Sequence, residues 1–157
     1  MANFEYQTLA TLLTVFYGTD TDFGAINCLI PEHAKVDETF PSLTRAVEYR
    51  DNCVFSSFWS VLAEEPLKDS SLPTISKLVN SSHAKDAFRK HVLQTLSLTF
   101  KSVSLSQVLS CLDFENEAEL NAFMKGRSPT TDGMVETVDV DKVVFCDNAE
   151  NTLYYYW

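Results

Sequence analysis

The sequence predicts a mainly helical protein, in which a helical-repeat array of antiparallel helix pairs is followed by a small winged helix with a β-hairpin. Through most of the chain the apolar residues recur at helical spacing, and five prolines divide it into pieces of helix length. Near the C-terminus two short helical segments precede β-rich segments, which is the layout of a winged helix. We therefore expect a helical-repeat domain over residues 1–102 and a winged-helix domain over residues 103–157.

The first helices are marked by apolar stripes at positions i, i+3, i+4 and i+7. Residues 9–16 carry such a stripe, and a second helix follows Asp20 and ends at Pro31. Residues 55–62 repeat the spacing, and we expect Trp59 within this stripe to lie in the core. No helix is apolar enough to be stable alone, so antiparallel neighbours must cover each stripe.

Prolines and polar caps indicate where the next helices begin. Pro41 and Pro73 each suit the first turn of a helix, where the missing backbone N–H is not needed. The longest helix is predicted over residues 82–100. Its inward side chains are expected to be Phe88, Val92, Leu96 and Phe100.

The predicted winged helix contains two short helices and three β-rich segments. Ser104 suits the N-cap of the first helix, and Asn116 followed by Glu119 resembles a capping box at the start of the second. Gly126 suits the stop of that second helix. The β-rich segments cover residues 134–140, 143–146 and 152–157. The five residues 147–151 are predicted to form the hairpin loop between the last two segments.

The charge of the chain argues against a nucleic-acid partner. The formal net charge is −10 and the pI is about 4.6. Residues 111–157 hold ten acidic side chains against three basic ones. Because a winged helix on a duplex needs Lys and Arg to neutralise phosphates, direct nucleic-acid binding is an alternative that this acidic region disfavours.

Cysteine usage predicts the cellular compartment. The four cysteines, at positions 28, 53, 111 and 146, are widely spaced and form no C-x-x-C motif. Isolated cysteines among apolar neighbours predict buried, reduced thiols, as in cytoplasmic proteins. No apolar run is long enough to cross a bilayer, and the N-terminus lacks a basic secretory start. These features predict a cytoplasmic or nuclear protein with no membrane partner, and we expect the cytoplasmic location.

The sequence gives no support for catalysis, a cofactor or a metal site. The four glycines form no phosphate-binding pattern, and the histidines at 33, 83 and 91 have no partner at metal-ligand spacing. No nucleophile has a base and an orienting group in a local signature. We therefore expect a protein that is not an enzyme.

Basic residues on the long helix are one candidate contact site. Lys85, Arg89 and Lys90 belong to the main basic concentration of an acidic protein. They would suit a contact with ribosomal RNA or with an acidic partner. The ordinary alternative for them is a solvated helix face.

The C-terminal aromatic run is a second candidate. Tyr154, Tyr155, Tyr156 and Trp157 are consecutive, and consecutive side chains of a strand point to opposite faces. A small winged helix has one core, so a helix of this chain must cover the outer face or that face must dock on another protein.

Several short motifs occur in a fixed order along the chain. Cys53-x-Phe55-x-x-Phe58-Trp59-x-x-Leu62 is the longest. The others are Thr21-Asp22-Phe23, Asp86 with Arg89-Lys90 and Thr99-Phe100, Glu119-Leu120 with Phe123-Met124, and Val143-Val144-Phe145-Cys146. Together they resemble the motifs of the subunit k family of eukaryotic translation initiation factor three, over nearly the whole chain from about Thr21. That family usually has further N-terminal helices and a C-terminal helical tail, and residues 134–141 look like an insertion.

This resemblance implies a non-catalytic structural subunit of translation initiation factor three. It implies helical repeats followed by a winged helix that packs on the winged helix of subunit l, in a complex on the small ribosomal subunit. A scaffold subunit of a proteasome lid or signalosome is the alternative. We hypothesise a docking surface formed by the helix at residues 116–125 and by the wing. Its partner-binding side chains would be Val143, Phe145, Tyr154, Tyr155, Tyr156 and Trp157.

Overall fold

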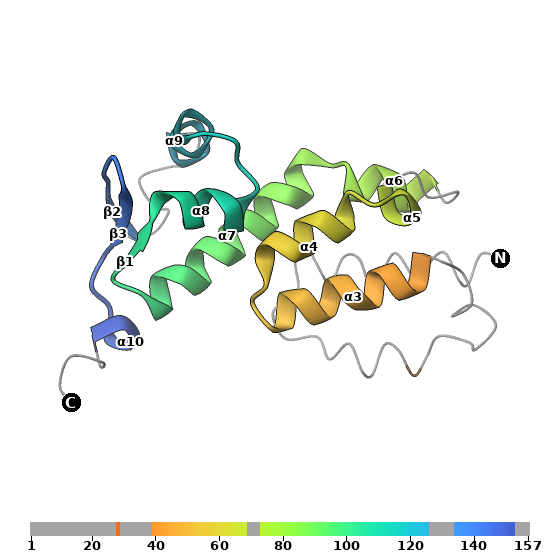
Figure 1. Ribbon diagram of the computed structural model, residues 1–157, viewed down its shortest axis with the longest axis horizontal. Coiled ribbons are helices and arrows are strands. Elements are labelled where there is room, and N and C mark those ends of the chain that lie inside the picture. The colour runs from red at the N-terminus through yellow and green to blue at the C-terminus, as the bar shows by residue number, and fades with distance from the viewer. Residues whose placement is uncertain (1–27, 29–38, 69–72, 126–133, 153–157) are drawn as a thin grey trace. The chain divides into compact units, whose positions relative to one another are not determined.

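The computed structural model describes Cys28 and residues 39–68, 73–125 and 134–152. The chain forms two compact units, of which the first extends to Phe88 and the second begins at Arg89. Figure 1 colours the elements of both units in chain order. The helix predicted at residues 9–16 lies outside the described residues, as does nearly all of the helix predicted before Pro31.

The first unit is a set of helices packed through apolar faces. α3 (Thr39–Asp51) packs against α4 (Phe55–Leu62), and both contact the short α5 (Glu65–Lys68). α6 (Pro73–Val79) packs on α5, and α7 (Ser82–Thr99) begins in this unit. The predicted helix starts are confirmed, because Pro41 lies in the first turn of α3 and Pro73 begins α6.

Aromatic rings fill the core of the first unit. Phe58 stacks on Phe88 with ring centroids 4.0 Å apart, and Trp59 meets Phe88 edge-on at 5.3 Å. Phe55 also approaches Phe88 edge-on, at 6.2 Å. The Trp59 side chain is 5% exposed, and those of Phe58 and Phe88 are fully buried. The prediction that Trp59 belongs to the core is therefore confirmed.

A left-handed turn at Cys53 ends α3. The φ angle of Cys53 is 57°, and the N–H of Val54 donates to the carbonyl of Tyr49 at 2.8 Å. The N–H of Cys53 donates to the carbonyl of Arg50 at 3.0 Å. This is a Schellman motif, in which glycine is usual because positive φ strains other residues. The Cys53 side chain is exposed, so the prediction of a buried thiol is wrong here: the turn leaves it outside the aromatic core.

The second unit has the element order of a winged helix. After the end of α7 it contains β1 (Ser102–Ser104), α8 (Leu105–Leu112), α9 (Glu117–Lys125), β2 (Val135–Val138), β3 (Lys142–Phe145) and α10 (Ala149–Thr152). The strands form an antiparallel sheet in the order β1-β3-β2, and α8 packs on β1, β3 and α9. β2 and β3 form a hairpin (Figure 1). The predicted fold class is confirmed.

Some predicted details of the second unit are wrong. The hairpin joins β2 to β3, whereas three of the five residues of the predicted hairpin loop, 149–151, belong to the helical turn α10 together with Thr152. The short strand β1 is not among the predicted elements. Phe100 is 47% exposed rather than inward, because α7 ends one residue before it. Residues 153–157 lie outside the described part of the chain.

Candidate functional site: a docking face on the winged helix

The sheet of the winged helix has a buried face and a polar face. Val143 pairs with Val103 on one side and with Val138 on the other, so these three side chains share a face. Val143 and its second neighbour Phe145 are each 1% exposed. The structure thus places these two predicted partner-binding side chains in the core. They pack on the buried face of the hairpin and do not form its outer surface.

The opposite face of the sheet is made of small polar side chains around one valine. Val144 pairs with Ser102 and with Thr137, and Ser102 and Thr137 are exposed. Successive strand residues alternate between faces, so these side chains point away from the core. A face of this composition is stable in water, and it needs no covering helix.

α9 presents the outer helical face of the winged helix. Its start is capped as predicted, because the N–H of Glu119 donates to Asn116 Oδ1 at 3.1 Å. Glu119 Oε2 in turn accepts a hydrogen bond from the N–H of Glu115 at 2.9 Å. Leu120 is buried at 1% exposure and fixes the inner face. The exposed residues of α9 are Glu117, Ala118, Glu119, Ala122 and Lys125.

Arg89 fastens the turn between α8 and α9. Its Nε donates to the carbonyl of Leu112 at 2.7 Å, and a terminal nitrogen donates to the carbonyl of Asp113 at 2.9 Å. Its guanidinium carbon lies 4.2 Å from the centroid of the Phe114 ring, and that ring is 5.5 Å from the ring of Phe123 in α9. We call this arrangement of Arg89, Leu112, Asp113 and Phe114 the arginine clasp. The Arg89 side chain is only 15% exposed and is used inside the unit.

The other two predicted basic contact residues take no part in the clasp. Lys90 is exposed and Lys85 is half-buried, both on α7. The structure therefore separates the three: Arg89 is a structural residue of the clasp, whereas a partner contact of Lys85 and Lys90 stays a prediction.

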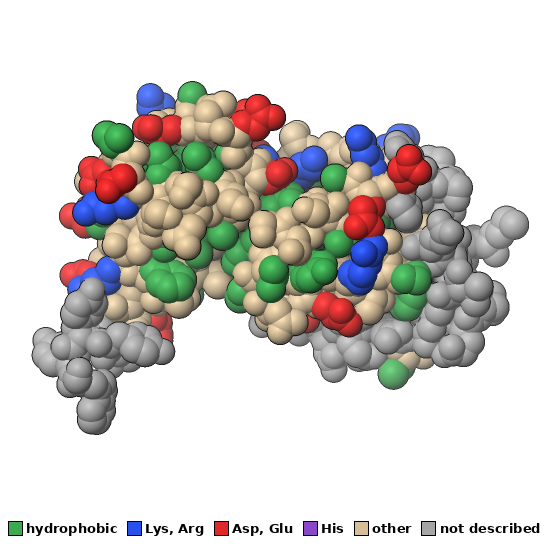
Figure 2. Space-filling view, viewed as in Figure 1, with side chains coloured by type: hydrophobic (Ala, Val, Ile, Leu, Met, Phe, Trp, Pro, Cys, Tyr) green, Lys and Arg blue, Asp and Glu red, His purple; other side chains and the backbone are tan. Residues whose placement is uncertain are grey.

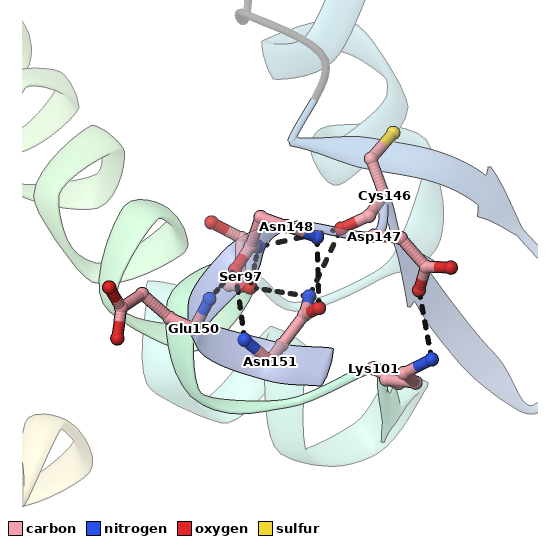
Figure 3. Close-up of polar contacts among 7 residues, drawn as sticks. All are labelled: Ser97, Lys101, Cys146, Asp147, Asn148, Glu150 and Asn151. Atoms are coloured by element: carbon pink, nitrogen blue, oxygen red, sulfur yellow. Dashed lines mark hydrogen bonds and ion pairs between the residues drawn. The ribbon is translucent and has the colours of Figure 1, made fainter. Parts of the chain in front are cut away.

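Two asparagines fasten the segment after β3 to the end of α7 (Figure 3). The side-chain amides of Asn148 and Asn151 both donate to the carbonyl of Ser97, at 2.8 and 3.0 Å. Asn151 also donates to the carbonyl of Cys146 at 3.0 Å and accepts from the N–H of Asn148 at 3.0 Å. Asn148 Oδ1 caps α10 by accepting from the N–H groups of Glu150 and Asn151, at 3.0 and 2.9 Å. We call Asn148 and Asn151 the asparagine pair.

The asparagine pair explains why no strand begins at Thr152. An N-cap residue followed three positions later by a side chain that bonds back to it starts a helix rather than a hairpin loop. The sequence contains this helix-start signal as Asn148-x-x-Asn151, between the two segments that are predicted to be strands. Lys101 and Asp147 form an ion pair at 3.0 Å, which lies beside the asparagine pair in Figure 3. The remaining predicted partner residues, Tyr154 to Trp157, lie outside the described residues.

The charge on the surface of the winged helix is mainly acidic. Glu117 and Glu119 lie in the first turn of α9, and Glu136, Asp139 and Asp141 are exposed on the hairpin. Figure 2 shows acidic groups around α9 and along the hairpin, with basic groups set singly between them. A helix with carboxylates at its N-terminus repels the phosphates of a duplex. The charge of this face therefore disfavours a nucleic-acid duplex as the partner of α9.

The described residues include no disulfide and no cluster of metal-binding side chains. The cysteines described there are free, and burial raises the pKa of the Cys111 thiol, so this thiol is less reactive than an ordinary one. Across residues 39–68, 73–125 and 134–152, no three His, Cys, Asp or Glu side chains gather to hold a metal ion. Nor does any helix described there combine the length and apolar character that crossing a bilayer requires.

Comparison with known proteins gives relatives of one kind. "Eukaryotic translation initiation factor 3 subunit K" of Aedes aegypti is 28% identical over 137 residues, which is 87% of this chain and 57% of the relative. The protein of the same name from Anopheles gambiae is 26% identical over 133 residues, which is 85% of this chain and 55% of the relative. The chain thus spans little more than half the length of these relatives. No solved structure matches it significantly.

A family model extends over most of the chain. It is described as the CSN8/PSMD8/EIF3K family, and it matches residues 1–143. The matched range contains the helices of the first unit, the arginine clasp and the hairpin up to Val143. The chain belongs to the CSN8/PSMD8/EIF3K family.

Proposed function

We propose that this protein is a structural, non-catalytic subunit of eukaryotic translation initiation factor three, the counterpart of its subunit K. In this proposal its winged helix docks on the winged helix of subunit l. The protein then supports assembly of the initiation complex on the small ribosomal subunit, in the cytoplasm. The two relatives that carry the name of subunit K support the choice of complex.

The observation that carries the proposal is the chemistry of the α9 face. In a winged helix that binds DNA, the second helix of the pair enters the major groove and needs basic side chains. Here the corresponding helix exposes Glu117 and Glu119 at its start and has two alanines, Ala118 and Ala122, among its exposed residues. Alanines let another protein surface approach closely, whereas the carboxylates favour a partner with basic groups. This face suits protein docking.

The first test is reconstitution with initiation factor three that has been purified without its subunit K. We expect the purified chain to bind this complex and to migrate with it and the small ribosomal subunit on a sucrose gradient. Ala118→Arg puts a large charged side chain on the exposed face of α9 and should weaken binding at least about tenfold, which is 1.4 kcal/mol. Binding that is unaffected by Ala118→Arg would remove α9 from the docking surface.

A matched control uses the same kind of change on the first unit. Ser60 is exposed on α4, and Ser60→Arg should leave both the melting temperature and the binding unchanged. A second arm tests the aromatic run: Tyr155→Asp or Trp157→Asp should weaken assembly while the helices remain folded. If both aspartate variants assemble normally, the aromatic run is not part of the interface.

The family description also names members of two sister complexes, so one alternative follows from it. A scaffold role in a proteasome lid or a signalosome would use the same fold. Purified lid and signalosome assemblies that lack the corresponding subunit serve as competing probes in the same assay. Preferential binding to either of them would overturn the assignment to translation initiation and keep the docking mode.

A further inference from the structure

The arginine clasp lies between the end of one helix and the start of the next. Asp113 ends α8 in a left-handed conformation with φ 55°, and the N–H of Phe114 donates to the carbonyl of Leu109 at 3.0 Å. The carbonyls of Leu112 and Asp113 belong to the end of α8, where a helix leaves acceptors without partners. Arg89 supplies donors to both of them. A cation at a helix C-terminus is also favoured by the helix dipole.

The clasp also contacts the first aromatic residue beyond α8. The Arg89 guanidinium carbon lies over the Phe114 ring, and Phe114 contacts Phe123 in α9. The last residue of α8 and the two residues that follow it are therefore held by a single side chain from α7. Because α9 begins three residues after Phe114, this turn determines where α9 lies and which of its faces is presented.

Only an arginine fits this combination of contacts. The guanidinium is planar, so one edge presents two fixed donors to two neighbouring carbonyls while its carbon lies over a ring. A lysine ammonium keeps the charge, but it is a compact group that cannot bridge two carbonyls and lie flat on a phenyl ring together. The charge of residue 89 and its geometry can therefore be separated by one substitution.

We propose that Arg89 is the positioning residue of the docking helix: through the clasp it sets the placement of α9 for its protein partner, although it does not touch that partner itself. The inference rests on the proposed function in naming α9 as the docking helix. It replaces a direct contact of Arg89 with ribosomal RNA or an acidic partner, which the sequence alone suggested. A direct contact requires the charge, whereas the clasp requires the geometry.

The test compares Arg89→Lys with Lys90→Ala and Val108→Ala. All three are assayed for binding to initiation factor three that lacks its subunit K. Arg89→Lys keeps the charge and loses the geometry, and we expect a loss of affinity of about tenfold or more. Lys90→Ala removes a charge from the exposed neighbour, and it should change affinity less than about twofold.

Val108→Ala controls for a general loss of stability. Val108 is fully buried on α8 and takes no part in the clasp, so its truncation lowers the melting temperature without releasing the turn. All binding is measured well below the melting temperatures. If Val108→Ala loses as much affinity as Arg89→Lys, or if Arg89→Lys binds like the wild type, the positioning role is refuted.

Hydrogen exchange provides a readout that does not depend on the partner. In Arg89→Lys we expect faster exchange of the amides of α9 and of the α8–α9 turn, while the amides of β3 stay protected. Uniformly faster exchange across the whole second unit would refute positioning, because it indicates general destabilisation. Should Arg89→Lys fail to fold, Phe114→Leu removes the stacked ring and keeps the carbonyl acceptors, and the same two outcomes apply.

The two proposals fail in different ways. If the wild-type chain does not bind the initiation factor complex, the proposed function fails and exchange in α9 still decides whether Arg89 holds that helix. If the wild type binds and Arg89→Lys binds equally well, the proposed function stands and the positioning role fails.

Discussion

Replacing Asn151 by alanine should destabilise the second unit, because its side chain makes three hydrogen bonds in a buried position. Asn151 is 3% exposed, and its amide group bonds the carbonyls of Ser97 and Cys146 and the N–H of Asn148. Alanine leaves the Asn148 N–H without this acceptor and the Cys146 carbonyl with only the 3.5 Å contact from Asn148. The Ser97 carbonyl keeps the Asn148 donor at 2.8 Å.

The expected magnitude follows from these remaining partners. A hydrogen bond contributes about 1 kcal/mol net, and a buried group left unsatisfied costs about 1–3 kcal/mol. With two groups weakened and one still bonded, Asn151→Ala should lower the free energy of unfolding by about 2–4 kcal/mol. This is a large part of the 5–15 kcal/mol that is typical of a folded domain.

Urea unfolding followed by circular dichroism measures this loss, and hydrogen exchange of β3 localises it to the second unit. Asn121→Ala is the matched control, because the Asn121 side chain makes an exposed hydrogen bond to Glu117 at 3.2 Å. That bond contributes about 0.5 kcal/mol at most. If Asn151→Ala costs no more than Asn121→Ala, the asparagine pair does not hold the segment after β3 to α7.

Three further changes probe other features. Trp59→Ala should cost about 3–5 kcal/mol in urea unfolding, since the ring lies in the aromatic core, and a cost below 1 kcal/mol would contradict that packing. Cys53→Gly should raise the free energy of unfolding by up to about 1 kcal/mol, because glycine relieves the positive φ; a lower stability would show that the thiol contributes contacts. In the native protein a thiol reagent should modify exposed Cys53 faster than Cys111, whose raised pKa keeps it protonated and delays its reaction to higher pH. Equal rates would refute that order.

The sequence predicts the helices well because their signals are local. Spacing of apolar residues identifies α4 and α7, and single capping residues such as Ser104 and Asn116 locate the starts of α8 and α9. In each case the residues that decide the structure lie within one or two turns of each other. The winged-helix order then follows from the order of these elements along the chain.

The errors concern contacts between residues that are distant in sequence. The end of the hairpin region depends on the carbonyl of Ser97, 51 residues before Asn148, and no pattern of apolar residues reports that partner. Arg89 looks like part of a basic surface until the end of α8, 23 residues later, is placed beside it. Val143 and Phe145 are predicted at an interface through the family resemblance, but each is 1% exposed, because the sequence does not tell which face of this strand the rest of the unit covers.

The irregular pairing of β2 bears on the tendency of the sheet edge to aggregate. Val135 pairs with Phe145 and Thr137 with Val144, so Glu136 is an extra residue in this edge strand. A bulge twists an edge strand away from regular pairing, and a charged side chain at that point disfavours addition of another strand. At the β2 edge, the bulge and Glu136 therefore disfavour the pairing of two copies of this chain through their sheets.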